Sequence, residues 1–284
     1  MILSRGTVAI AFVVGALALA LGGCGDGEEP AGASTAAEMQ DYRSYLEDEA
    51  ASLLDWTEQL RGQIAVGEAG KAGSRYATSR VQYGQLLPAQ LMIDDIDQRL
   101  NGPQVEGQPF TGYHRIEKPL FAAESTAGLK PVAKALVFEV RKLRSEIAAM
   151  PLAPAPLAAA TEQLLNRVVS RQLTGKEEPY SGVDLVDASA SIEGAEAAFK
   201  AISPSLGPEA DSLEAEVEAA FKQIYGRLKQ FGTPARFPQT RPAAAGARFI
   251  AYDDADENQL EGLRVEVRKL QKLLAEVPAA LEAE

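Results

Sequence analysis

Residues 129–147 read LKPVAKALVFEVRKLRSEI, and their apolar side chains recur at steps of three and four. The members of this stripe are Leu129, Val132, Leu136, Val140, Leu143 and Ile147. Such spacing places the whole set on one face of an α-helix, with charged residues on the other faces. A second stripe of the same period lies near the C-terminus and consists of Leu260, Leu263, Val267, Leu270, Leu274 and Val277. Because we find no convincing strand alternation anywhere, the sequence predicts an all-α fold.

Two short internal matches indicate that the helices form two related bundles. Residues 139–143 (EVRKL) recur as residues 266–270, and residues 57–60 (TEQL) recur in the same order as residues 161–164. An internal duplication would explain these matches, although short runs of Glu, Lys and Leu also arise by chance in helices. The break between the bundles is predicted near residues 151–156 (PLAPAP), because a helix interior does not tolerate such a run of prolines.

The N-terminus has the composition of an export signal. Arg5 provides a positive charge, residues 8–21 are uncharged and mostly apolar, and two glycines precede Cys24. This pattern is typical of a lipoprotein signal peptide, in which a cysteine after the cleavage point receives diacylglycerol. We therefore expect residues 1–23 to be removed and Cys24 to be the lipid attachment site of an extracytoplasmic protein, in a periplasm or on a cell surface. An ordinary secretory signal with a stray cysteine is the alternative.

Composition limits the nature of the mature chain. Residues 24–34 are rich in small and acidic residues and predict a flexible tether, and a capping-box pattern at Thr35 predicts the start of a helical domain over residues 35–284. Cys24 is the only cysteine, so the domain has no internal disulfide and no cysteine-based metal site. The net charge of −12 argues against a nucleic-acid partner.

The only histidine, His114, lies three residues before Glu117 in the segment 110–118 (FTGYHRIEK). On a helix, the two side chains face the same way and could share one cation. Two ligands do not make a site, however, and a surface histidine paired with a neighbouring glutamate is the simpler interpretation. Residues 177–178 (EE), in a predicted loop, are interpreted as a solvated charge pair.

Several segments, in order along most of the chain, carry a resemblance to a known family. They are residues 74–81 (SRYATSRV), 96–99 (IDQR), 110–118, 180–185 (YSGVDL), 192–195 (IEGA) and 251–253 (AYD). On these segments the chain resembles the imelysin-like M75 family, and within it the iron-uptake proteins of the EfeO/EfeM type, in the short form without a cupredoxin domain.

The resemblance implies two four-helix bundles and a protein that binds iron, or another divalent or trivalent metal ion. It further implies two partners, a membrane iron permease and a peroxidase-like protein. The implied metal ligands are His114 and Glu117, which carry over directly, with Asp97 as a further partner and Glu193 as a weaker one.

Two carboxylates of the family pattern are missing here. The family's Glu-x-x-Glu pair falls on Gly84 and Leu87, and the loss of two anionic ligands lowers the affinity for a hard cation. Either Asp94, Asp95 or Glu106 compensates, or metal binding is weak or lost. In the second case the chain would be a helical scaffold or adaptor lipoprotein that binds a protein or polysaccharide partner.

Catalysis is not expected, although the family carries a peptidase name. An HxxE motif lacks the second histidine of the H-E-x-x-H zinc proteases. A nucleophilic triad also cannot be assembled, because the chain has one histidine and its one cysteine is assigned to the lipid.

Overall fold

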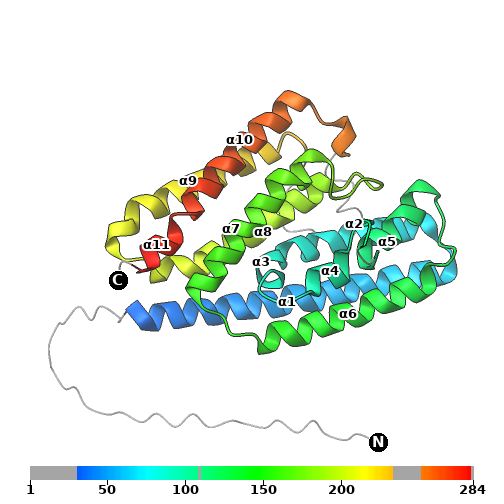
Figure 1. Cartoon of the computed structure of the whole chain (residues 1–284), viewed down its shortest axis with the longest axis horizontal. Coiled ribbons are helices and arrows are strands. Elements are labelled where there is room, and N and C mark those ends of the chain that lie inside the picture. The colour runs from blue at the N-terminus through cyan, green and yellow to red at the C-terminus, as the bar shows by residue number, and fades with distance from the viewer. Residues whose placement is uncertain (1–30, 108–109, 233–250, 283–284) are drawn as a thin grey trace, which may run out of the picture.

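The computed structural model describes residues 31–107, 110–232 and 251–282 of the 284-residue chain. These residues form helices joined by turns, with no β-strand among them, so the all-α prediction is confirmed (Figure 1). Cys24, the predicted signal peptide and most of the predicted tether lie outside the described residues. Within the described part, no helix is both long and apolar enough to cross a membrane.

The first group of helices surrounds the long N-terminal helix. Its members are α1 (Ala31–Val66), α2 (Ala69–Gln85), α3 (Leu87–Gln90), α4 (Ile96–Asn101), α5 (Gly112–Glu117) and α6 (Leu129–Ala149). Helix α1 packs against both α2 and α6, and α4 and α5 also pack against α6 (Figure 1). Helix α1 begins four residues before the predicted start at Thr35, so the last residues of the predicted tether are helical.

The second group follows in the chain. Its longer members are α7 (Pro154–Ser170), α8 (Asp184–Ile202), α9 (Asp211–Leu228), α10 (Glu257–Leu274) and α11 (Val277–Glu282). Helix α7 contacts α8, α8 contacts α9, α9 contacts α10, and α10 returns to α7, which closes a four-helix ring. Short helical turns complete this half: η2 (Gln172–Thr174), η3 (Ser203–Ser205), η4 (Pro208–Ala210) and η6 (Tyr252–Asp254).

The predicted repeat falls on corresponding helices of the two groups. Residues 57–60 lie in α1 and residues 161–164 in α7, while residues 139–143 lie in α6 and residues 266–270 in α10. Helix α6 ends at Ala149 and α7 begins at Pro154, with two prolines in its first turn, where a missing N–H costs nothing. The duplication itself stays a prediction.

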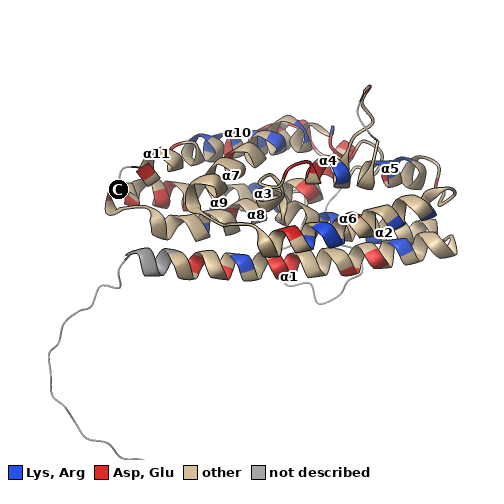
Figure 2. Cartoon of the chain, turned by 60° about the horizontal axis from the view of Figure 1, so that its bottom comes forward, with Lys and Arg blue, Asp and Glu red and all other residues tan. Residues whose placement is uncertain are grey.

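The two predicted apolar stripes face the core. All of their members are buried except Val132, which is partly buried, and Val277 lies in α11 rather than at the end of α10. One continuous cluster of buried apolar residues runs through both groups. Helix α8 connects them, because it is buried along most of its length and packs against α1 and α2 as well as α7. Charged side chains of both signs are interspersed along the helices (Figure 2).

The two positions on which the resemblance places a Glu pair, residues 84 and 87, lie in the packed interior, and α2 and α8 are in close contact at residue 84. A Cβ atom added at Gly84 would lie 2.7 Å from the Cβ of Ala190, and one added at Gly194 would lie 2.5 Å from the carbonyl oxygen of Gln85. Leu87 is completely buried. The positions that would carry two carboxylates are therefore used for helix packing, and a longer side chain at residue 84 would push the helices apart.

Candidate metal centre

The HxxE helix is held at a fixed place by its first residue. Gly112 has φ of +56°, and a Cβ atom there would lie 1.8 Å from the carbonyl oxygen of Leu100 at the end of α4. Only glycine fits this contact, so α5 starts pressed against α4. At its other end α5 passes directly into a π-helical turn, η1 (Lys118–Ala122). His114 and Glu117 consequently point into the protein, where His114 is 4% exposed and Glu117 is completely buried.

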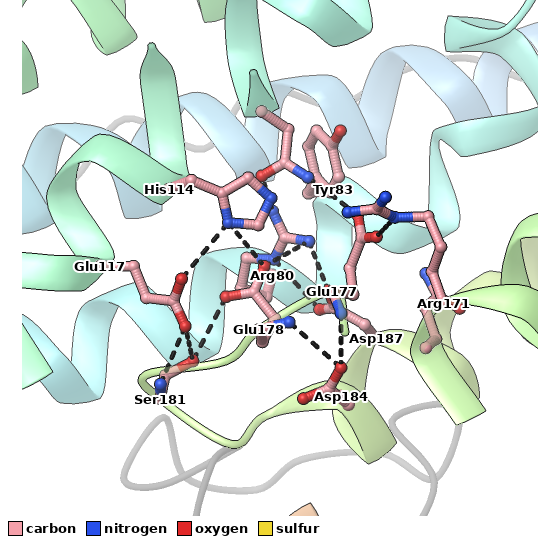
Figure 3. A network of polar contacts seen from close by, with 12 residues as sticks. Arg80, Tyr83, His114, Glu117, Arg171, Glu177, Glu178, Ser181, Asp184 and Asp187 are labelled. Carbon is pink, nitrogen blue, oxygen red and sulfur yellow. Dashed lines mark hydrogen bonds and ion pairs between the residues drawn. The ribbon is translucent and has the colours of Figure 1, made fainter. Parts of the chain in front are cut away.

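Three potential metal ligands converge at this point (Figure 3). His114 Nδ1 lies 3.3 Å from Glu117 Oε2 and 4.0 Å from Glu178 Oε1. Two ligand atoms that each lie about 2.1 Å from one ion can be at most about 4.2 Å apart. Both measured distances meet this limit, and one ligand atom of each residue lies within 4.8 Å of the others. Only small shifts would close the three residues around a single cation.

The second nitrogen of the imidazole does not face the carboxylates. His114 Nε2 is buried and has no hydrogen-bond partner among the described residues. Buried polar atoms are rarely left in this state, since an unmade hydrogen bond costs about 1–3 kcal/mol. The case for His114 as a ligand therefore rests on Nδ1, the ring nitrogen that faces the two carboxylates, and Nε2 on the other side of the ring adds nothing to it.

The carboxylate of Glu117 is fixed by a loop from the second group of helices. Its Oε1 accepts hydrogen bonds from the backbone N–H of Tyr180 (2.9 Å), the backbone N–H of Ser181 (2.8 Å) and the hydroxyl of Ser181 (2.9 Å). Burial alone would raise the pKa of Glu117, but these bonds and the contact with His114 hold it below its ordinary value. Glu117 is thus an ionised, preoriented carboxylate.

Glu178 is held by the Tyr-x-x-x-Arg element of α2. Its Oε2 accepts a hydrogen bond from the hydroxyl of Tyr76 (2.5 Å), and its Oε1 pairs with the guanidinium of Arg80 (2.9 Å). Arg80 is completely buried and also forms an ion pair with Asp187. Burial, helped by the nearby carboxylates of Asp187 and Glu117, raises the pKa of Glu178 well above its ordinary value despite Arg80. A cation bound here would favour the ionised form.

The neighbouring residue, Glu177, anchors the same turn. It forms ion pairs with Arg167 and with Arg171 (2.6 Å) and accepts a hydrogen bond from the amide of Asn101 (3.0 Å). Burial opposes its ionisation, but the two guanidiniums hold the pKa of Glu177 well below its ordinary value. The interpretation of residues 177–178 as a solvated pair is therefore wrong, because both side chains are completely buried.

The structure places the other two predicted ligands elsewhere. Asp97 accepts hydrogen bonds from the hydroxyl of Tyr83 and from Arg167 (2.7 Å). Glu193 accepts one from the amide of Gln85 (2.9 Å). Neither residue belongs to the one group of three or more potential ligands found among the described residues. The three suggested replacements for the lost pair are all exposed and do not join the centre either: Asp94, Asp95 and Glu106.

Sequence patterns alone miss Glu178 as a ligand, although one signal points to it. The residue stands two positions before the family-like segment 180–185, whose backbone amides and serine bind Glu117. Because residues 180 and 181 contact Glu117 in α5, residue 178 in the same loop also lies near α5.

Comparison with known proteins identifies the family of the chain. Residues 38–274 match the family model described as Imelysin, which covers most of the chain. The chain belongs to the imelysin family. The chain is 25% identical over 244 residues to the iron uptake system component EfeM of Bacillus subtilis (strain 168). It is 29% identical over 227 residues to the iron uptake system component EfeO of Escherichia coli (strain K12).

These alignments cover 85% and 78% of this imelysin chain but 60% and 58% of the two relatives, so the chain spans about three-fifths of their length. The label of the family model contains the word peptidase, whereas both relatives are named as components of iron uptake systems.

Proposed function

We propose that this protein binds iron at the His114–Glu117–Glu178 centre and serves as an extracytoplasmic, lipid-anchored component of an iron uptake system. The observation that carries the proposal is the convergence of one imidazole nitrogen, His114 Nδ1, and two carboxylates in a buried place. The names of the relatives support the choice of iron.

The ligand set suits a cation that is carried rather than kept. Imidazole and carboxylate together are ligands that iron and similar first-row ions accept. Three protein ligands leave coordination positions open, whereas structural sites are usually closed by four or more. An ion held in this way can be passed to another ligand without unfolding the protein.

Location and partners are inferred from the N-terminal pattern and the family. Lipid on Cys24 and a tether that starts at residue 24 would keep the helical domain close to a membrane, and therefore within reach of an iron permease. A peroxidase-like protein is the second proposed partner. A Cys24→Ser variant should appear in the soluble fraction instead of the membrane fraction, and unchanged membrane association would contradict the anchor.

The metal site is tested by titrating the purified protein with ferrous, ferric, zinc and copper ions. We expect binding well below millimolar for at least one iron species, and a large loss in His114→Ala and Glu117→Gln. Glu106→Gln removes the same charge as Glu117→Gln at an exposed position and should bind as the unmodified protein does. Binding no tighter than millimolar, or binding unchanged in His114→Ala, would contradict the site.

A scaffold or adaptor function is the second candidate, and a specific observation favours it. The places of the family's Glu pair are taken by Gly84 and Leu87, both of which pack in the protein interior. This candidate predicts no metal binding but retained binding of a protein or polysaccharide. Peptide hydrolysis is not expected, and hydrolysis that is abolished in Glu117→Gln would show otherwise.

A further inference from the structure

The segment that carries Glu178 is a short loop with a glycine in the left-handed conformation at each end. We call residues 175–182 the ligand loop. Gly175 has φ of +67° and Gly182 has φ of +66°. Between them, the backbone N–H groups of residues 177 and 178 donate to Asp184 Oδ1 at 3.0 and 3.1 Å. The loop therefore brings one ligand to the centre and, through residues 180 and 181, positions another.

One residue contacts both ends of the ligand loop. The backbone N–H of Tyr252 donates to the carbonyl oxygen of Gly182 at 3.0 Å. Its ring lies against Gly175, where an added Cβ atom would be 2.6 Å from ring atom Cδ1. Its hydroxyl donates to the carbonyl oxygen of Leu173 at 3.0 Å, just before the loop. Tyr252 thus contacts the loop at both of its ends.

Tyr252 is itself held in place by a residue of α10. Arg264 donates from Nη2 to the hydroxyl of Tyr252 at 2.9 Å and from Nε to the carbonyl oxygen of Leu173 at 2.7 Å. Its side chain is largely buried, and it pairs with Glu257 at 2.6 Å and with Glu261 at 3.2 Å. The position of the loop is consequently tied to the second group of helices, although the HxxE helix belongs to the first.

A groove lies beside the loop and borders one residue that contacts both carboxylates. The groove has a volume of about 670 Å³ and is lined by small residues of α2, by Phe121, by Glu124 and by Ser181. The hydroxyl of Ser181 touches both Glu117 (2.9 Å) and Glu178 (3.2 Å), so this residue stands between the groove and the buried carboxylates. Because His114, Glu117 and Glu178 are all buried, we expect an ion to enter or leave only when the loop moves.

We infer that Tyr252 is a positioning residue that clamps both ends of the ligand loop, and that it sets how fast a cation enters and leaves the His114–Glu117–Glu178 centre. The inference rests on the proposed function for the identity of the cargo. It goes beyond that function in assigning control of exchange to a residue that does not touch the ion.

The test compares substitutions of Tyr252 with a matched tyrosine. Tyr252→Phe keeps the ring against Gly175 but removes both hydroxyl hydrogen bonds, and Tyr252→Ala also removes the ring, whereas both variants keep the backbone bond to Gly182 and so test the side-chain contacts at the Gly175 end. Tyr225→Phe is the control, because the hydroxyl of Tyr225 bonds to Glu196 (2.8 Å) rather than to the ligand loop. Purified protein loaded with Zn²⁺, which avoids oxidation, is mixed with an excess of chelator and the release is followed by stopped flow.

We expect release to be about tenfold faster in Tyr252→Phe, the effect of about 1.4 kcal/mol, and faster still in Tyr252→Ala. The control should release at the unmodified rate. Amide hydrogen exchange of the metal-free protein gives a second readout. The N–H groups of Tyr180 and Ser181, which donate to Glu117, should lose protection in Tyr252→Ala while amides of α6 keep it.

Unchanged release and unchanged exchange in both variants would overturn the inference. A uniform loss of protection across α6 and the ligand loop would also overturn it, because Tyr252 would then support the fold in general. If the unmodified protein binds no Zn²⁺ or iron, the proposed function fails by itself, and the metal-free exchange measurement still decides whether Tyr252 clamps the loop.

Discussion

Two sets of metal ligands are to be distinguished: the structure brings Glu178 to His114 and Glu117, whereas the family resemblance implied Asp97 and Glu193. Replacing Glu178 by glutamine tests which set binds the metal. Glutamine has the same size and shape: its amide oxygen can accept from Arg80 in the place of Oε1, and its NH2 group can donate to the hydroxyl oxygen of Tyr76 in the place of Oε2. The substitution therefore removes one negative charge and leaves the packing intact. Metal binding should fall, while the metal-free fold should not.

The size of the loss can be worked out from the geometry. His114 Nδ1 and Glu178 Oε1 are 4.0 Å apart, so an ion bound to both lies about 2 Å from that oxygen. Even at 4 Å, two unit charges in a partly buried setting interact by about 4 kcal/mol. Arg80 offsets part of this attraction because it pairs with the same oxygen. We therefore expect a loss of roughly 3 kcal/mol, which is a dissociation constant raised about a hundredfold.

The stability of the metal-free variant should move in the opposite direction. Because the pKa of Glu178 is raised in the folded protein, its contribution to folding is complete at acid pH and is lost as the pH rises through the folded-state pKa. Glutamine does not ionise and keeps that contribution. Glu178→Gln should thus unfold at the same or a higher temperature than the unmodified protein at alkaline pH.

Isothermal titration with ferrous ion under anaerobic conditions and thermal unfolding without metal measure the two effects. Glu193→Gln and Asp97→Asn are the comparison variants, since the structure places neither side chain in the centre. We expect them to bind within a few-fold of the unmodified protein. A hundredfold loss in Glu193→Gln or Asp97→Asn, with Glu178→Gln unaffected, would refute the assignment of the third ligand.

Three further predictions concern packing, pH and ion charge. Gly84→Ala should cost about 1–3 kcal/mol in the free energy of unfolding, because the new methyl group meets Ala190, whereas Gly62→Ala, with open space around it, should gain up to about 1 kcal/mol. Burial and the neighbouring carboxylates raise the pKa of Glu49 to about 7. The Glu49→Gln variant should therefore be more stable than the unmodified protein by roughly 2–3 kcal/mol at about pH 8 and equally stable at about pH 4. Denaturant unfolding at both pH values measures this difference. Competition between ferrous and ferric ions should favour the divalent ion, because Arg80 already supplies a positive charge to the centre, and a clear ferric preference would contradict this.

Most of the fold could be predicted from local pattern alone. The stripes from Leu129 and from Leu260 have the helical period, and the structure buries them as expected. The pairing of His114 with Glu117 was predictable for the same reason, since residues three apart share a helix face. These features depend only on neighbours in sequence.

The proposed third ligand, Glu178, could not be predicted in this way. Two glutamates before a proline have the composition of an exposed loop, and only tertiary contacts bury them. The compensating cations come from elsewhere in the chain: Arg80 from α2 and Arg167 from α7. In the same way, Asp97 and Glu193 are carboxylates in family-like segments, but each is satisfied by partners that its own sequence neighbourhood does not reveal.

The charge of the buried centre is the reason for the expected preference for a divalent ion. Glu117, Glu178 and Asp187 provide three carboxylates and Arg80 one guanidinium, which leaves two negative charges when all are ionised. A divalent ion neutralises this set, whereas a trivalent ion would leave a positive charge without solvent, which is costly. Two more carboxylates, at residues 84 and 87, would raise the negative charge of this set above what a divalent ion can neutralise. If the proposed function holds, the three carboxylates and the one buried arginine would make the centre neutral with a divalent ion bound.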